Sequence, residues 1–321
     1  MNTPDINSAT ENGQNFRESG IVHLSEAKDF LVGKWFQVKS IRQPWRNVFA
    51  VIESGKWQFA FKLASTPWVG ERLKNEVSWN IELNKILELS GDTNSFIIPK
   101  IFESGEWNGL PYYISEYFPG AFINNRTPED CEILESWLER IVDCNLFFLS
   151  LEDDKLNFYR DRDFTNIADY TDRGARRIES WVEDIPERDL SLLMEQITAL
   201  KKGFVFGVNH GDFIPWHMIM QGEKFVLIDG EHGSTKTLRY YDISYFYHRV
   251  YTALQNPTLA KKYLKILINR LPQAEKELFE KQFPKVLASR IIGGYFDAKH
   301  DGTSYDIHDQ LQEKFLNDSY K

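Results

Sequence analysis

The chain has 321 residues, with 38 Lys and Arg against 47 Asp and Glu, and a formal net charge of -9. Because 42% of its residues are hydrophobic and 14% aromatic, it can form a substantial core, and a mainly disordered chain is excluded. The net negative charge disfavours nucleic acid as the main partner, since phosphate backbones select basic surfaces. The length fits two domains, or one domain with two lobes.

Cysteine spacing and hydropathy narrow the class of protein further. Cys131 and Cys144 form no Cys-x-x-Cys pair, so we expect neither a zinc site nor a disulfide framework, as fits a cytoplasmic protein. No stretch reaches the roughly 18 apolar residues that a membrane-spanning helix needs. The polar segment 1–20 lacks the apolar core of a signal peptide, and we expect it to be a flexible tail.

Strand-like runs dominate residues 21–118. The second and third runs are joined by Ser54-Gly55-Lys56, a short hairpin signal. Apolar residues at helical spacing then predict a helix over Gly70–Leu89, and two more strands follow it. The predicted strands are Lys34–Val38, Val48–Glu53, Trp57–Ala64, Phe96–Ser104 and Leu110–Tyr117. This order predicts a small β-rich lobe with one key helix.

The helical period predominates over residues 119–321, which predicts a larger and mostly helical lobe. A strand-rich segment interrupts the helices at Phe204–Val208, Met218–Met220 and Lys224–Ile228. The predicted helices are Glu129–Leu149, Asp163–Glu183, Glu187–Lys202, Tyr241–Leu254, Thr258–Leu271, Ala274–Ala298 and Tyr305–Asp318. The predicted fold class is therefore α+β, with two unequal lobes.

Two aspartates in the second lobe each follow a predicted strand. Asp212 lies in a His-Gly-Asp stretch that begins at His210, and Asp229 comes seventeen positions later. We expect the two carboxylates to converge, an arrangement that phosphoryl transfer needs. One carboxylate orients a substrate hydroxyl and accepts its proton, while the other holds a divalent ion that neutralises phosphate oxygens. Carboxylate oxygens suit a hard cation such as Mg²⁺.

These residues resemble the aminoglycoside phosphotransferase and choline kinase-like family, which has the protein-kinase fold. In that family the catalytic loop reads His-Gly-Asp with Asn five positions later, and an Ile-Asp-Trp-Glu-like stretch carries a metal ligand. The resemblance implies that Asp212 is the catalytic base and Asp229 a metal ligand, and that His210 supports the loop. Asp242 matches a mainly structural Asp at the start of the next family helix, and Glu231 matches a frequent Asp-x-Glu pattern.

The first lobe carries the same resemblance. A Phe-Ala-Phe-Lys stretch ending at Lys62 is similar to the third strand of the family, whose lysine contacts the α- and β-phosphates. The following helix offers Glu71, Glu76 and Glu82 as partners for this lysine, and Glu76 fits best because it precedes the apolar stripe as in the family. The segment Ile114–Gly120 resembles the hinge that presents backbone groups to adenine. The nucleotide-binding residues implied there are Glu116, Tyr117 and Phe118.

Two positions depart from the family pattern. His217 stands where the family has its second metal ligand, Asn, and imidazole suits Mn²⁺ or Zn²⁺ better than Mg²⁺. We therefore expect either that His217 contributes through a water or a softer metal, or that one metal site is weakened. The segment Ser40–Asn47, which would cover the phosphates, has no glycine, and charge from Arg42 or Arg46 would replace contacts by backbone amides.

The expected activity is that of a small-molecule kinase. It would transfer the γ-phosphoryl group of ATP or GTP, with Mg²⁺ or Mn²⁺, to a hydroxyl of a sugar, aminoglycoside or amino alcohol. The alternative is a nucleotide-binding pseudokinase acting as a regulator or scaffold, which His217 and the glycine-free loop favour. A Ser/Thr protein kinase ranks third, because no Ala-Pro-Glu follows Asp229 and Gly230–Tyr241 is too short for a long activation loop.

The charge balance differs between the two predicted lobes. Residues 1–118 carry a formal charge of -2, and residues 119–321 carry -7. The acidity therefore lies mostly in the lobe that would bind the acceptor, not in the lobe that would bind the nucleotide. This favours a neutral or cationic acceptor, because net charge steers charged ligands.

Overall fold

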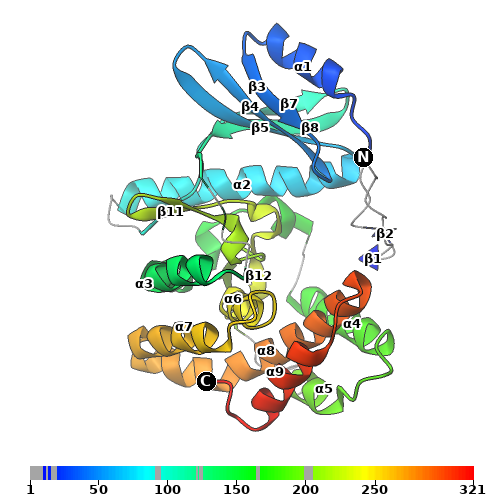
Figure 1. Ribbon diagram of the computed structural model, residues 1–321, viewed down its shortest axis with the longest axis vertical. Helices are drawn as coiled ribbons and strands as arrows, with labels where there is room; N and C mark the ends of the chain where they lie inside the picture. The colour runs from blue at the N-terminus through cyan, green and yellow to red at the C-terminus, as the bar shows by residue number, and fades with distance from the viewer. Residues whose placement is uncertain are drawn as a thin grey trace.

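Two lobes are stacked in the molecule, with a sheet in one and packed helices in the other (Figure 1). The computed structural model describes residues 10–11, 14–15, 20–90, 95–120, 122, 126–163, 167–198 and 205–321. The expected flexible tail, residues 1–20, lies mostly outside the described residues, although β1 (Thr10–Glu11) and β2 (Gln14–Asn15) form a short antiparallel pair. The expected α+β class with two unequal lobes is confirmed.

The first lobe is built on a five-stranded antiparallel sheet with the strand order β3-β4-β5-β8-β7. Side chains alternate between the two faces of each strand. Val48, Ala50 and Ile52 of β4 therefore all point into one core and are fully buried. The strands are β3 (Gln37–Arg42), β4 (Asn47–Ser54), β5 (Trp57–Ala64), β7 (Ile101–Trp107) and β8 (Leu110–Glu116).

An unexpected helix, α1 (Leu24–Gly33), precedes the sheet. Its buried residues Ala27 and Leu31 belong to the core of the sheet. The expected first strand, Lys34–Val38, is wrong at its start, because the Lys34 amide still donates to helix carbonyls and β3 begins three residues later. In this short helix the apolar spacing spans too few turns to predict it from periodicity alone.

Helix α2 (Pro67–Ser90) lies between the sheet and the second lobe (Figure 1). Trp79 and Leu83, from its second half, are buried in the core of the second lobe. The short strand β6 (Phe96–Ile97) also joins the second lobe, where it pairs in parallel with β11 (Lys224–Leu227). The lobes are therefore connected by a shared helix and a shared sheet as well as by the hinge.

The single strand expected over Phe96–Ser104 is wrong, because this segment contributes to two sheets. β6 pairs in the second lobe and β7 pairs with β8 in the first. Pro99 lies between them and has no N–H to continue a ladder. Its carbonyl accepts a hydrogen bond from the Asn80 side chain of α2 at 3.0 Å, which holds the chain where it changes lobe.

Long helices and two short strand pairs form the second lobe. β10 and β11 make an antiparallel hairpin, and β9 pairs with β12. The helices are α3 (Pro128–Ser150), α4 (Ile167–Glu183), α5 (Ser191–Thr198), α6 (Tyr241–Thr252), α7 (Pro257–Arg270), α8 (Gln273–Asp301) and α9 (Asp306–Leu316). The remaining strands are β9 (Phe206–Asn209), β10 (Met218–Gln221) and β12 (Ser234–Leu238). Short 3₁₀ segments are η1 (Asp153–Lys155), η2 (Tyr159–Asp163), η3 (Pro215–His217) and η4 (Gly230–His232).

Two further expectations are corrected in this lobe. The sequence predicts no strand between Gly230 and Tyr241, yet this interval contains β12, whose polar residues lack a strand-like alternation. β12 is held in place by a polar contact instead of a hydrophobic pattern, because the carboxylate of Asp161 in η2 accepts a hydrogen bond from the Thr235 amide at 2.7 Å. The helix expected over Glu187–Lys202 starts later, at Ser191, where Asp189 accepts from the Ser191 amide at 3.1 Å.

No helix in the described part of the chain is long and apolar enough to cross a bilayer.

Candidate active site

The loop after β9 is held by the first turn of α6. The two carboxylate oxygens of Asp242 accept hydrogen bonds from the amides of His210, at 2.6 Å, and Gly211, at 2.8 Å. Gly211 has φ +82°, and a Cβ at this position would lie 2.5 Å from the carbonyl oxygen of His232. Only glycine meets both conditions. The loop is therefore positioned by main-chain contacts immediately before Asp212.

His210 is fully buried and connects this loop to the end of β11. Its Nε2 lies 2.9 Å from the Ile228 carbonyl, and its Nδ1 accepts from the Asp212 amide at 3.3 Å. Burial, together with the charge of His217, lowers the pKa of His210 to about 4. The imidazole is therefore neutral, with its proton on Nε2. These contacts favour the loop-supporting role that the resemblance implied for His210, which stays a prediction.

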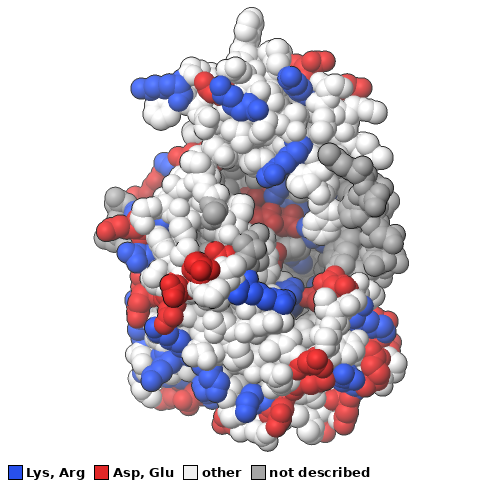
Figure 2. Space-filling model, viewed as in Figure 1, with Lys and Arg blue, Asp and Glu red and all other residues white. Residues whose placement is uncertain are grey.

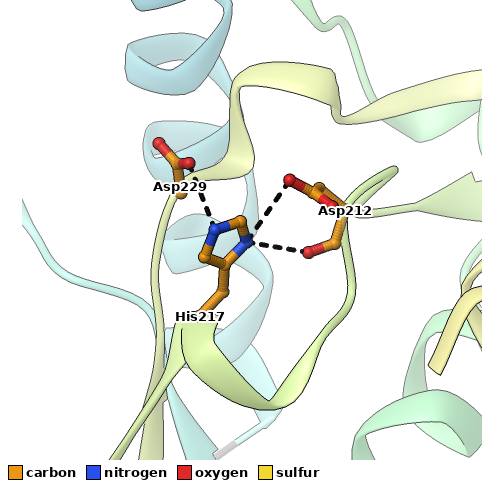
Figure 3. Close-up of side chains that lie close together, drawn as sticks. All are labelled: Asp212, His217 and Asp229. Carbon is orange, nitrogen blue, oxygen red and sulfur yellow. Dashed lines mark hydrogen bonds and ion pairs between the residues drawn. The ribbon is translucent and has the colours of Figure 1, made fainter. Parts of the chain in front are cut away.

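Asp212, His217 and Asp229 converge at one point between the lobes (Figure 3). His217 Nδ1 lies 2.9 Å from the Asp212 carbonyl and 3.6 Å from Asp212 Oδ2. On the other side of the ring, Nε2 lies 3.5 Å from Asp229 Oδ2. One atom from each side chain lies within 4.8 Å of the others. Asp212 Oδ1 is buried and has no hydrogen-bond partner among the described residues.

Asp229 adopts a left-handed backbone conformation, with φ 65° and ψ 44°, at the point where the chain leaves β11. Asp tolerates this conformation better than most residues. Lys62 Nζ lies 2.6 Å from Asp229 Oδ1. Burial alone would raise the pKa of Asp229, but the charge and hydrogen bond of Lys62 together with the charge of His217 outweigh burial, and the pKa falls to about 2. Asp229 is therefore ionised.

Lys62 of β5 also contacts α2, and the structure selects one of the three candidate glutamates. Lys62 Nζ lies 2.7 Å from Glu76 Oε2, and the Tyr113 hydroxyl donates to Glu76 Oε1 at 3.0 Å. Glu71 and Glu82 instead pair with lysines three positions along their own helix. The buried lysine therefore lies between two carboxylates, one from α2 and one from the end of β11.

Glu231 is central to a second ion-pair network, which the sequence indicated only through the Asp-x-Glu pattern. Its side chain is only 4% exposed. Arg46, from the turn between β3 and β4, lies 2.9 Å from Glu231 Oε1, and Arg72 of α2 lies 3.3 Å from the same atom. Arg46 was expected to face phosphates, and here it connects the covering turn to η4. No sequence signal predicted Arg72.

The hinge residues lie at the end of β8. The Glu116 amide donates to the Lys100 carbonyl at 2.9 Å, and the Glu116 carboxylate accepts from the Lys100 amide at 3.0 Å. These reciprocal bonds fix the strand end against the start of β7. Tyr117 and Phe118, which follow, are half-buried. Contact of these three residues with a nucleotide base remains a prediction.

The donor set at the point of convergence fits a divalent cation. Two carboxylates and one imidazole offer ligand atoms within 4.8 Å of one another. A histidine that binds metal through one ring nitrogen usually donates its other N–H to a carbonyl or carboxylate. His217 has this second contact, because Nδ1 faces the Asp212 carbonyl and leaves Nε2 toward Asp229.

The comparison that decides the family covers most of the chain. The model of the phosphotransferase enzyme family (APH) matches residues 37–278. The chain belongs to this family. The resemblance stated from Asp212, Asp229 and Lys62 is therefore confirmed at the level of the family.

Solved structures with the same fold are distant in sequence. Aminoglycoside phosphotransferase APH(4)-Ia, in a complex with ADP and hygromycin B, has a TM-score of 0.62 at 12% identity, over 91% of this chain and 97% of that chain. The GDP complex of aminoglycoside 2'-phosphotransferase-IIIa has a TM-score of 0.61 at 11% identity, over 93% and 99%. At such identities the likeness establishes the protein-kinase-like fold alone. No curated protein matches the sequence.

Proposed function

We propose that this member of the phosphotransferase family is a small-molecule kinase that uses ATP or GTP. The observation that carries the proposal is the convergence of Asp212, His217 and Asp229 beside the Lys62–Glu76 ion pair. These groups come from both lobes, as a reaction between a nucleotide and an acceptor requires. Asp212 Oδ1 has no hydrogen-bond partner among the described residues, so it can accept a hydrogen bond from a substrate. A purely structural network would not require this free acceptor.

In the proposed reaction, an acceptor hydroxyl donates a hydrogen bond to Asp212. The acceptor oxygen forms a bond to the γ-phosphorus as the bond from that phosphorus to the β–γ bridging oxygen breaks. The hydroxyl proton passes to Asp212, and the nucleoside diphosphate leaves. The transition state is loose, so positioning and charge neutralisation supply most of the rate enhancement.

The remaining residues have supporting roles in this proposal. Lys62, held by Glu76, would contact the α- and β-phosphates, and backbone groups at residues 116–118 would contact the base. Asp229 and His217, with Asp212 nearby, would hold Mg²⁺ or Mn²⁺, which neutralises phosphate oxygens when bound. Residues 21–118 would bind the nucleotide and residues 119–321 the acceptor.

The proposed acceptor is a small molecule that carries a hydroxyl group. Two of the structurally similar phosphotransferases were solved with hygromycin B and with kanamycin, which are polyhydroxylated compounds. This supports a sugar-like or amino-alcohol-like acceptor for the present chain.

The test is nucleotide turnover by Asp212→Asn against the unchanged protein. We expect kcat to fall about 100-fold or more for ATP or GTP with a screen of polyols, amino sugars and amino alcohols, because the general base is lost. Asp154→Asn, at an exposed position, is the matched control and keeps the activity. Equal rates for Asp212→Asn and the unchanged protein would refute the role. Nucleotide binding without turnover on any acceptor would favour the pseudokinase.

A further inference from the structure

A row of side chains crosses the sheet of the first lobe and includes a second cation besides Lys62. Arg42 of β3 lies directly opposite Phe49 of β4, and Phe49 lies directly opposite Lys62 of β5. Residues opposite each other in paired strands point to the same face of the sheet. Lys62 points toward the second lobe, where it contacts Asp229. Arg42 therefore lies on the face of the sheet that is turned to the candidate active site.

The neighbours of Phe49 in β4 support this assignment. Val48 and Ala50 are fully buried in the core that the sheet shares with α1. Because successive residues of a strand alternate between the two faces, Phe49 points away from that core. The guanidinium carbon of Arg42 lies 5.9 Å from the centroid of the Phe49 ring, so both side chains are on the face toward the second lobe.

The guanidinium group of Arg42 is available for a ligand, although its backbone is held in place. Arg42 is exposed, and within the described part of the chain no carboxylate forms an ion pair with it. The next residue, Gln43, fixes the end of β3. Its side-chain amide donates to the Gly20 carbonyl at 2.6 Å, and its side-chain oxygen accepts from the Val22 amide at 3.1 Å.

Arg46, the other arginine of the covering segment (Ser40–Asn47), is engaged elsewhere. Its Nη2 lies 2.9 Å from Glu231 Oε1, and the two side chains are 11% and 4% exposed. A phosphate bound by Arg46 would remove the closer of the two arginine partners of Glu231, and breaking a buried ion pair is destabilising. Arg46 therefore positions the covering segment against η4, and Arg42 remains to face a nucleotide.

A polyphosphate in this place needs positive charge from side chains. Figure 2 shows a hollow between the lobes with acidic side chains in its depth and basic side chains around it. The covering segment has no glycine, so its backbone amides approach a phosphate less closely than those of a glycine-rich loop. Neighbouring strands lie about 4.8 Å apart, which places Arg42 and Lys62 about 10 Å from each other along the sheet. Two cations on either side of Phe49 suit the several negative charges of a nucleotide.

We propose that Arg42 binds the terminal phosphates of the nucleotide, across Phe49 from Lys62, while Arg46 holds the covering segment in position through Glu231. The proposal rests on the proposed kinase function and adds a nucleotide-binding residue to it. A guanidinium group can donate two parallel hydrogen bonds to a phosphate, which fits this role. The sequence offered Arg42 or Arg46 for the phosphates, and the two residues thus have separate roles.

The experiment compares nucleotides that differ in the number of phosphates. Calorimetry measures the binding of AMP-PNP, ADP, AMP and adenosine, and of the corresponding guanine compounds, at one fixed Mg²⁺ concentration. For Arg42→Met, whose exposed position leaves the core intact, we expect the dissociation constant of the triphosphate analogue to rise about tenfold or more, because charge-assisted hydrogen bonds are lost. Binding of the monophosphate and the nucleoside stays nearly unchanged. Arg42→Lys, which keeps the charge, loses less affinity than Arg42→Met.

Lys39→Met is the matched control, because Lys39 lies on the same strand and pairs with Glu53 at 2.7 Å. It keeps the affinity of the unchanged protein for every nucleotide. Equal triphosphate affinity of Arg42→Met and Lys39→Met overturns the proposal, and so does a loss of affinity that is confined to Arg46→Met. If the unchanged protein binds no nucleotide, the proposal and the kinase function are overturned together. A selective loss in Arg42→Met, without transfer by the unchanged protein to any acceptor, counts against the kinase function alone.

Discussion

At the scale of single residues, His217 carries the strongest prediction about the metal. Burial lowers the pKa of His217, but the charges of Asp212 and Asp229 outweigh burial and the net shift is upward. A protonated His217 ring therefore places its positive charge between the two carboxylates, where a metal cation would bind. Since imidazole is a better ligand for Mn²⁺ than for Mg²⁺, we expect Mn²⁺ to support the higher kcat/KM.

The matching variant is His217→Asn, which restores an oxygen ligand. We expect it to reverse the order of the two metals by about tenfold in their kcat/KM ratio, measured at saturating nucleotide and fixed pH. His300→Asn, at a histidine that contacts Asp184 instead, serves as the control. A metal ratio that His217→Asn leaves unchanged would contradict a ligand role.

Lys62 gives a second prediction at this scale. It is the cation between the carboxylate of Glu76, which is buried, and that of Asp229, which is 25% exposed, so Lys62→Met leaves both without their shared partner. We expect nucleotide affinity to fall at least tenfold and the free energy of unfolding to fall by about 3 kcal/mol. Fluorescence titration with a nucleotide analogue and urea denaturation measure the two effects. The control is Lys85→Met, which removes an exposed ion pair with Glu82 and should change neither nucleotide affinity nor stability. Equal effects of Lys62→Met and Lys85→Met would refute the prediction.

At the scale of elements, contact between α2 and η4 sets the position of Asp229. Gly230 and Gly233 pack against the ring of Trp79, and a Cβ at Gly230 would lie 2.1 Å from its Cδ1. The Asn75 side chain donates to the carbonyls of Glu231 and Gly233, at 3.0 and 2.9 Å. The segment after Asp229 is thus placed by a helix that also carries Glu76.

Gly230→Ala tests this contact. The added methyl cannot fit unless α2 and η4 separate, and we expect a loss of about 1–3 kcal/mol in stability together with a clear fall in kcat. Gly33→Ala is the control, because a Cβ there meets nothing within 4 Å. Chemical denaturation and turnover are measured on both. A Gly230→Ala protein as stable and active as Gly33→Ala would show that the contact is dispensable.

The residues of the candidate site were easier to predict from the sequence than the elements around them. Asp212, Asp229 and Lys62 lie in short motifs whose residue types are dictated by chemistry, so local sequence is informative. Glu76 was favoured by its position on the helix, and the structure pairs it with Lys62. Arg72 could not be predicted, since its contact with Glu231 depends on how α2 crosses the second lobe.

The elements that were missed lack a strong local pattern. β12 is held by backbone pairing with β9 and by the Asp161 carboxylate. Neither contact requires a hydrophobic alternation in the sequence of β12, so the sequence carries no strand signal there. β6 is too short for periodicity to separate it from β7, and only its partner β11 shows that it belongs to the other lobe. Such features depend on tertiary contacts, which override weak local preference.

At the scale of the whole molecule, the second lobe buries two histidines where three helices meet. His248 and His308 lie at the contact of α6, α8 and α9, with ring centroids 5.6 Å apart. His308 faces Arg249, Asp297 and Asp309. Burial and Arg249 lower the pKa of His308 to about 4, whereas the two aspartates oppose the shift. The neutral ring is therefore the stable form in the folded protein.

This predicts a protein that is less stable in mild acid. Between pH 6.5 and 4 the unfolded chain binds a proton at residue 308 that the folded chain does not, so stability falls as pH falls through this window. From pH 7 to pH 5 the loss is about 2 kcal/mol from His308 alone. In urea denaturation at both pH values, His308→Gln should lose correspondingly less stability between them than the unchanged protein, whereas His23→Gln, at an exposed position, should not differ. An undiminished pH effect in His308→Gln would show that this buried histidine does not couple folding to protonation.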